Sequence, residues 1–263
     1  MSVPAGPDDK MRIGGILMPG RQLRATSGNP AAWISLNAVD NAGLIWDELG
    51  NNSAESGLQP FLLSGMHGET ARPWDSGEAV TEPEDTTRID SIDVARALEG
   101  WWNGRTPNDQ DLAKYEDARE MIAPFGTRFP GLAPNLEEEL DPELMRRALF
   151  QYTRDARVGL VPAARPADIL ARLGWQGACN SRTPLDLAAV LRSWEDRFGA
   201  RLLEVGFADI RLLVSRPPQT LQAAYRIAAE HFAFSDEAQC GLRMIGEIAR
   251  ALVNNPFWDF WWD

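Results

Sequence analysis

Apolar residues in the second part of the chain recur at the spacings of helices and strands. A helix over 184–198 has Thr183 as its cap, Gly199 as its stop and one apolar face. That face consists of Leu187, Val190, Leu191, Trp194 and Phe198. The same reasoning predicts strands over 158–162, 201–205, 210–215 and 257–262, and helices over 166–173, 221–232 and 243–253.

The order of these elements is strand, helix, strand, strand, helix, strand, with one more helix before the last strand. This order is that of the β-α-β-β-α-β unit of ferredoxin-like domains. We therefore predict an α+β fold, in which a C-terminal ferredoxin-like sheet over 151–263 carries its helices on one face.

The first part of the chain has a weaker pattern, and its elements are separated by longer polar stretches. We expect a disordered leader over 1–10, an acidic α+β region over 11–150, and an irregular, solvated acidic loop over 65–90. Short strands are predicted over 12–17, 32–36 and 60–63, and helices over 37–54, 92–102, 109–122 and 141–152. Asp141 and Pro142 fit the first positions of the last of these helices.

The segment 257–263 (FWDFWWD) has two different faces if it forms a strand, because alternate side chains point to opposite sides. Trp258, Phe260 and Trp262 would form an aromatic core face. The other face would carry Phe257, Asp259, Trp261 and Asp263, which mix aromatic and acidic groups. We expect this mixed face to pack against the rest of the chain or to line a cleft for a ligand or partner.

Charge is distributed unevenly between the two parts. The formal net charge is −12, and residues 1–150 carry all of it, with 25 acidic and 13 basic residues against 13 of each in 151–263. An acidic chain disfavours general binding to nucleic acid and to anionic membranes. A basic protein partner would instead dock on the acidic loop, and its candidate contacts are Asp75, Glu78, Glu82, Glu84 and Asp85.

Familiar catalytic and metal-binding motifs are absent. The chain has no G-x-S-x-G, Walker A, H-E-x-x-H, C-x-x-C or EF-hand spacing, and we expect no metal and no cofactor. The first ten residues have no pattern of a secretory signal, so we expect reduced thiols at Cys179 and Cys240 and a cytoplasmic location. His67, between glycines, is expected to be an exposed loop residue.

Glu230 and His231 are the residues best suited to acid–base chemistry, with Asp236 and Cys240 just beyond them. His231 also falls on the apolar face of its helix, so a structural histidine in the core is the alternative. Arg192 and Asp196 are four residues apart, and we expect them to pair on the solvent face. A bidentate arginine site for a carboxylate or phosphate is the other possibility for Arg192.

Three C-terminal segments resemble an uncharacterised bacterial family, domain of unknown function 4253. They are PLDLAAVLRSWEDRFGARLLEVGF (184–207), RPPQTLQAAYRIAAEHFAF (216–234) and FWDFWWD (257–263). The resemblance extends over about 157–263 and is weaker over 72–134, at RPWDSGE, the Gly-Trp-Trp of 100–102 and FPGLAP. It implies no known activity, cofactor or catalytic residue. Ser235 stands where members of the family often have cysteine, which argues against a thiol function there.

These observations lead to two main hypotheses. The first is a non-enzymatic, immunity- or antitoxin-like module that presents its acidic face to a protein partner. The alternative is an enzyme or small-ligand-binding domain with a cleft between the two parts of the chain. There, the catalytic candidates His231 and Glu230 would converge with the ligand-binding candidates Trp175, Arg192, Asp259, Trp261 and Asp263. The protein is expected to be a monomer, or a homo-oligomer such as a homodimer that pairs through the last strand.

Overall fold

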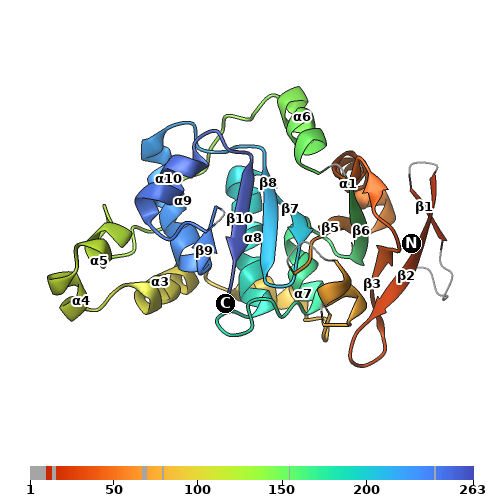
Figure 1. Cartoon of the computed structure of the whole chain (residues 1–263), viewed down its shortest axis with the longest axis horizontal. Helices are drawn as coiled ribbons and strands as arrows, with labels where there is room; N and C mark the ends of the chain where they lie inside the picture. Colours follow the sequence, from red (N-terminus) through yellow and green to blue (C-terminus); the bar gives the residue numbers. More distant parts are fainter. Residues whose placement is uncertain (1–9, 14–15, 67–69, 79, 154, 240) are drawn as a thin grey trace.

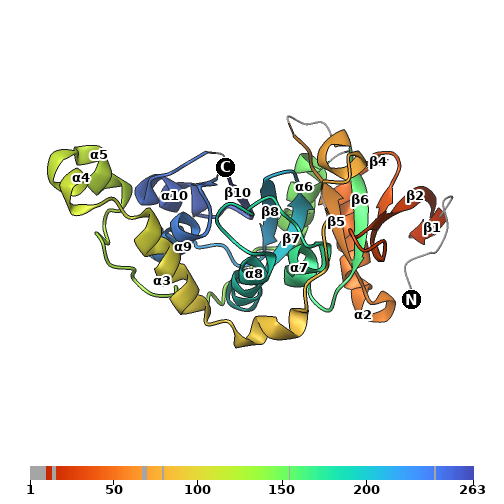
Figure 2. The ribbon, with the colours of Figure 1, turned by 90° about the horizontal axis from the view of Figure 1, so that it is seen from below.

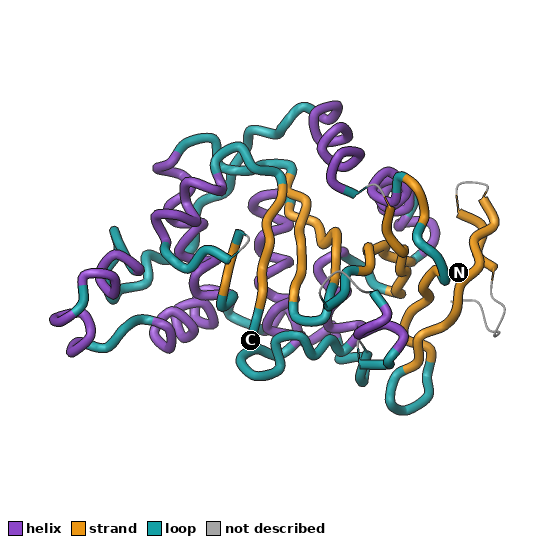
Figure 3. Tube along the Cα trace, in the orientation of Figure 1, coloured by secondary structure: helices purple, strands orange, loops and turns teal. Residues whose placement is uncertain are grey.

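One mixed sheet runs through the molecule and takes strands from both parts of the sequence (Figures 1 and 3). The computed structural model describes residues 10–13, 16–66, 70–78, 80–153, 155–239 and 241–263. The leader expected over 1–10 therefore lies outside the described residues, except for Lys10 at the start of β1. The strands are β1 (Lys10–Ile13), β2 (Ile16–Arg24), β3 (Pro30–Ser35), β4 (Val39–Asp40), β5 (Leu58–Leu63), β6 (Asp155–Pro162), β7 (Ala200–Val205), β8 (Asp209–Val214), β9 (Glu237–Ala238) and β10 (Phe257–Trp261).

The strand order is β1-β2-β3-β6-β5-β7-β8-β10-β9, and β4 pairs with β6 at one end. Strand β5 lies between β6 and β7, and it is parallel to β7, with Leu62 opposite Glu204. The other pairings of the described strands are antiparallel. All six residues of β5 are buried, as expected for a strand in the middle of a sheet.

The α+β class is confirmed, but the ferredoxin-like strand order is not. The predicted elements β6, α8, β7, β8, α9 and β10 follow one another along the chain as expected. In space, however, the apolar strand β5 from the first part occupies the position beside β6 and β7. Strand β10 pairs with β8 and with the short β9, so it is not at the edge.

Helices cover both faces of the sheet (Figure 2). They are α1 (Ala42–Asn51), α2 (Ser53–Ser56), α3 (Val94–Arg105), α4 (Asp109–Lys114), α5 (Glu116–Met121), α6 (Pro142–Tyr152), α7 (Ile169–Leu173), α8 (Pro184–Phe198), α9 (Leu221–Phe234) and α10 (Ile245–Leu252), with short helical turns η1 (Ala71–Asp75), η2 (Thr86–Ser91) and η3 (Pro166–Asp168). Helices α7, α8, α9 and α10 contribute to the largest core, whereas α1 and α6 pack on the opposite face. Helices α4 and α5 project at one end of the molecule (Figures 1 and 2).

Capping side chains mark where three helices begin, and two of them, those of Asp141 and Thr183, were predicted from the sequence. The side chains of Asp141, Thr183 and Thr220 accept hydrogen bonds from the first turns of α6, α8 and α9. Gly199 ends α8 in the left-handed region, with φ of 63°. The single helices predicted over 37–54 and 109–122 are each divided into two in the structure.

Most described residues of the acidic segment 70–93 are exposed, as predicted for a solvated loop, but the segment is also packed against the second part of the chain. The backbone N–H of Thr81 donates to Leu173 O at 3.1 Å, and that of Glu84 donates to Ala171 O at 2.8 Å. Turns η1 and η2 lie within this segment, and the side chain of Trp74 is fully buried. Polar composition did not reveal this packing, because its partners lie far away in the sequence.

Candidate functional site

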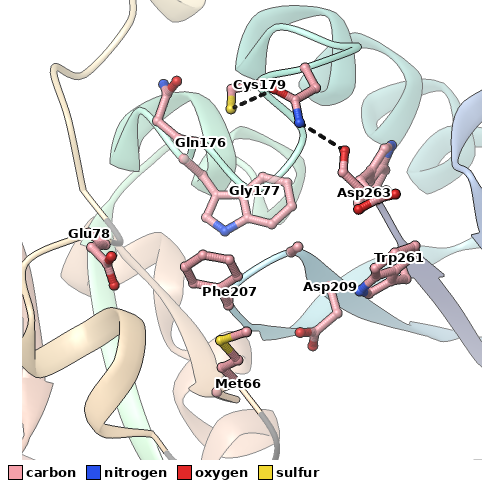
Figure 4. A pocket seen from close by; sticks show the side chains of 14 residues that line it. Met66, Glu78, Gln176, Gly177, Cys179, Phe207, Asp209, Trp261 and Asp263 are labelled. Carbon is pink, nitrogen blue, oxygen red and sulfur yellow. Dashed lines mark hydrogen bonds between the residues drawn. The ribbon is translucent and has the colours of Figure 1, made fainter.

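A cavity of about 710 Å³ lies where three strands end. Strands β5, β7 and β10 run in the same direction, since β5 is parallel to β7 and both β7 and β10 are antiparallel to β8. Their carboxyl ends therefore meet at one edge of the sheet, together with the loop 174–183. We call this cavity the cleft; it is lined by residues 65–66, 78, 175–177, 179–180, 207–209 and 261–263 (Figure 4). Its volume is typical of small-molecule sites.

Four aromatic side chains, those of Trp175, Phe207, Trp261 and Trp262, line the cleft. Trp175 is buried, its Nε1 donates to Gly206 O at 2.9 Å, and its ring meets that of Trp262 edge to face at 5.6 Å between centroids. Phe207 also lines the cleft and is half-buried (Figure 4). Trp261 is 38% exposed, so its ring is available at the mouth of the cleft. Fixed rings such as these provide a preformed apolar surface.

Gly177 allows the loop 174–183 to pass close to this wall. A Cβ atom at Gly177 would lie 2.0 Å from the Trp175 ring and 2.5 Å from Phe207 O. Any larger residue would therefore displace the ring or the hairpin between β7 and β8. The glycine keeps the loop and the aromatic wall in contact.

The polar groups of the cleft are carboxylates, amides and one thiol. Asp209 extends from the hairpin between β7 and β8, where burial raises the pKa of its carboxyl although Ser64 donates a hydrogen bond to it. Asn180 Nδ2 donates to Asp263 O at 3.0 Å, and Cys179 has an exposed, reduced thiol. The described residues that line the cleft include no lysine, arginine or histidine.

Arg72 stands beside the cleft and is already engaged. Its guanidinium binds both carboxylate oxygens of Glu78, at 2.7 and 2.9 Å, and lies 4.7 Å from the centre of the Phe207 ring. The hydrogen bond from Arg72 holds the pKa of the Glu78 carboxyl below its usual value. Glu78 is therefore a neutralised rim residue, whereas Asp209 lies where burial disfavours its charge.

A second, smaller cavity of about 210 Å³ adjoins the cleft and shares Asp209 and Trp261 with it. Arg211 lies in this cavity between Glu204, at 3.2 Å, and Asp259, at 2.5 Å. Burial raises the pKa of the Glu204 carboxyl, and the neighbouring charges of Asp209 and Asp259 add to the effect. Carboxylates thus outnumber the single guanidinium that they surround.

Four predicted ligand-binding residues lie at these two cavities. Trp175, Trp261 and Asp263 line the cleft, and Asp259 lines the smaller cavity. The two faces of β10 also differ as expected: Trp258, Phe260 and Trp262 are buried, whereas Asp259 is half-buried and Trp261 is exposed. The mixed face of this strand indicated the position of the cleft.

His231 lies in the core and not at the cleft. It is completely buried between the rings of Trp194, Trp258 and Phe260, with centroids 4.6 to 5.0 Å from its own. Neither ring nitrogen has a hydrogen-bond partner among the described residues. Burial holds the pKa of His231 well below its usual value, so the imidazole is neutral. Cys240, expected near it, is outside the described residues, as is His67.

Glu230 is also buried, but it is fully bonded. Its carboxylate accepts two hydrogen bonds from Arg197, at 2.8 and 2.7 Å, one from Trp194 Nε1 at 2.7 Å and one from the N–H of Ala133 at 2.6 Å. Arg197 also donates to Ala133 O at 2.9 Å. This cluster attaches the irregular segment 129–134 to α8 and α9, and it leaves no free carboxylate oxygen for acid–base chemistry.

Arg192 also lies away from the cleft, and its predicted pairing with Asp196 is wrong. Its guanidinium binds Asp168 at 2.7 Å and Asp90 at 2.5 Å, whereas Asp196 binds Arg165 at 2.5 Å. Arg192 binds residues distant in sequence instead of Asp196, because the segment 70–93 lies along α8 and brings Asp90 to Arg192. The cleft therefore brings together neither Arg192, His231 nor Glu230.

The acidic side chains proposed as a partner surface are mostly used within the molecule. Asp75 binds Arg21 at 2.8 Å and Arg157 at 3.1 Å, and Glu78 binds Arg72. Glu82 accepts a hydrogen bond from the N–H of Ser27, and Asp85 caps η2 through Thr87. Burial raises the pKa of the remaining carboxyl, that of Glu84.

Sequence reasoning missed Met66, Phe207 and Asp209, which line the cleft from the ends of β5 and the β7–β8 hairpin. The turn Gly206–Asp209 joins β7 to β8 and places the half-buried Phe207 at the cleft. Its place at the cleft depends on the pairing of β5 with β7, which local sequence patterns do not indicate.

The described part of the chain has no group of three or more His, Cys, Asp or Glu residues arranged to hold a metal ion. Its helices also include none with the length and apolar character needed to cross a membrane. Comparisons with curated proteins and with solved structures found no match. Residues 157–263, which contain most of the cleft, match the family model described as Domain of unknown function (DUF4253), and the resemblance seen in the sequence is thereby confirmed.

Proposed function

We propose that this protein binds a small molecule with an aromatic or other flat apolar part in the cleft. The observation that carries the proposal is the cavity of about 710 Å³ with three tryptophan rings and Phe207 in its wall. Folded proteins rarely leave such an apolar surface open without a ligand or partner for it. The carboxyl ends of parallel strands are also a common place for ligands in open sheets.

The sequence predicted, as one hypothesis, a cleft between the two parts of the chain, where His231 and Trp261 would converge. The proposed ligand site includes Trp261 but lies away from His231. His231 and Glu230 are closed in the core, so they do not support an enzyme in which these residues act as base and acid. The proposed function is therefore binding, and the residues that would contact the ligand are Trp175, Phe207, Asp209 and Trp261.

An interaction with a basic protein partner stays a prediction from the charge distribution. The internal bonds of Asp75, Glu78, Glu82 and Asp85 do not favour the acidic segment as its surface. We therefore place the small-molecule hypothesis first.

Titration of indole, a neutral flat probe, into the full chain tests the proposal, with ligand-observed NMR as the readout. We expect binding that Trp261→Ala weakens at least about tenfold, because the substitution removes an exposed ring from the mouth of the cleft. The matched control is Tyr115→Ala, which removes an exposed aromatic side chain from the projecting end of the molecule and should change nothing.

Alkylation of Cys179 gives a second readout, because its thiol lines the cleft. Peptide mapping by mass spectrometry distinguishes it from Cys240. Bound indole should slow alkylation of Cys179. Indole binding that neither responds to Trp261→Ala nor protects Cys179 would place the probe elsewhere and contradict the proposal, as would no binding at millimolar indole.

A further inference from the structure

We infer that the ligand of the cleft is an organic cation, a small molecule that joins a flat apolar body to an amine or guanidine group. This inference rests on the proposed function, because it names the class of ligand that the same cleft would take.

The charged groups that line the cleft are all acidic. Glu78, Asp209 and Asp263 face it, and no basic side chain does so among the described residues. Several other carboxylates bind arginines, as Asp75 binds Arg21 and Arg157. Since Glu78 is bonded to Arg72, the uncompensated charge lies at the opposite side, near Asp209 and Asp263.

Asp209 is the group that a ligand cation would contact most directly. Its carboxyl is largely buried, and the nearest guanidinium, that of Arg211, is bonded to Glu204 and Asp259. Burial raises the pKa of Asp209, and the charge of Asp259 adds to this effect, whereas the hydrogen bond from Ser64 and the charge of Arg211 lower the pKa. A positive group placed in the cleft would add a counter-charge on the side away from Arg211, within a partly desolvated site where such a contact is stronger than in water.

The aromatic wall fits the same class of ligand. The rings of Trp175, Phe207 and Trp261 can cover a flat apolar body, and ring faces attract cations. One such contact already exists at the rim, where Arg72 lies over Phe207. An anionic ligand would instead meet the carboxylates of Glu78, Asp209 and Asp263, and no basic side chain lines the cleft among the described residues. A neutral ligand would cover Asp209 without any charge to balance it.

Three indoles that differ in charge and share one flat body provide the test. They are tryptamine, which is a cation, indole-3-ethanol, which is neutral, and indole-3-propionate, which is an anion. With the full chain at neutral pH and low salt, we expect tryptamine to bind about tenfold more tightly than indole-3-ethanol, and the anion to bind most weakly.

Substitution of Asp209 assigns the preference to one side chain. Asp209→Asn should reduce the advantage of tryptamine over indole-3-ethanol to less than about threefold. Glu99→Gln is the matched control, since it removes one exposed carboxylate on α3, outside the cleft, and should leave the advantage intact.

The outcomes separate this inference from the proposed function. Equal affinity of the three indoles, or a tryptamine preference that survives Asp209→Asn, would overturn the inference, while binding that depends on Trp261 would still support the cleft as a ligand site. No binding of any indole at millimolar concentration would overturn both. Tighter binding of indole-3-propionate would contradict the sign of the charge argument.

Discussion

Two aromatic regions meet at β10, one on each side of the strand, and they differ in whether they are closed. Trp258, Phe260 and His231 belong to a core in which rings pack on rings with no opening to solvent. Trp261 stands on the other face, at the mouth of a cavity lined by acids and rings. The closed region contains Glu230 and His231, the side chains that the sequence indicated as best suited to acid–base chemistry. The open region holds ordinary acids and tryptophans, so access to solvent, and not residue type, distinguishes the candidate site.

Glu230→Ala should have the largest effect on stability in the closed region. The substitution leaves the guanidinium of Arg197 buried without its counter-charge and frees the bonds to Trp194 and Ala133. We expect a loss of about 3–5 kcal/mol in the free energy of unfolding, measured by urea denaturation. The control Glu139→Ala breaks the more exposed pair with Arg216 and should cost less than about 1 kcal/mol. Similar losses of stability in both variants would show that the buried cluster contributes no more than the exposed ion pair.

Replacing each tryptophan on the two sides of β10 compares the regions directly. Trp258→Ala should destabilise the fold by about 3–5 kcal/mol, because the side chain is completely buried among other rings. Trp261→Ala should cost about 1 kcal/mol or less, since the ring is 38% exposed, and should mainly lower the affinity for indole. Thermal or urea denaturation of the two variants measures the difference. Equal destabilisation would mean that Trp261 is a core residue.

Acid should weaken the closed region through His231. Below about pH 6.5 the imidazole of the unfolded chain takes up a proton, whereas the folded protein keeps His231 neutral because burial lowers its pKa. The unfolded state then binds more protons, so stability falls as the pH falls, by about 1.4 kcal/mol per pH unit until the folded pKa is reached. Urea denaturation of the wild type and of His231→Leu at pH 7.5 and 5.5 isolates this contribution. Parallel pH dependence in the two proteins would rule it out.

Asp209→Asn should have the smallest effect on the free energy of unfolding. Whether the substitution raises or lowers this free energy distinguishes a binding residue from a structural one. Burial raises the pKa of Asp209 in the folded protein, so the folded state binds the proton more readily than the unfolded chain. The stability that this group contributes is present at low pH and is lost as the pH rises through the folded pKa. At pH 7.5 the variant should therefore equal or exceed the wild type, by less than about 1 kcal/mol. A clear loss of stability at pH 7.5 would make Asp209 a structural residue.

The sequence predicted the elements whose signals are local. Thr183 and Gly199 mark the ends of α8, and the alternation of FWDFWWD separates the two faces of β10. For the face with Trp261 and Asp259, the sequence left packing against the rest of the chain and a cleft as alternatives, and both residues line a cavity. These predictions succeed because caps and strand alternation depend on neighbours within a few residues.

Contacts between distant segments were not predictable in the same way. The apolar run of β5 indicated a buried strand but not its position between β6 and β7. The acids of segment 70–93 gave no sign that Arg21, Arg157 and Arg192 would bind them. Asp209 was missed for the same reason, because its burial depends on Ser64 and on strands that only the whole fold brings together.

The position of β5 also has a consequence for how the cleft comes into being. Residues 65–66 follow β5 early in the chain, and the opposite wall follows β7 and β10 near its end, so the pairing of Leu62 with Glu204 must close a very long loop. Such non-local pairings form late, because the entropy of loop closure opposes them until other contacts exist. A nascent or partly folded chain has only one wall of the cleft. Only the fully folded protein would thus bind the ligand, and a bound ligand would slow unfolding.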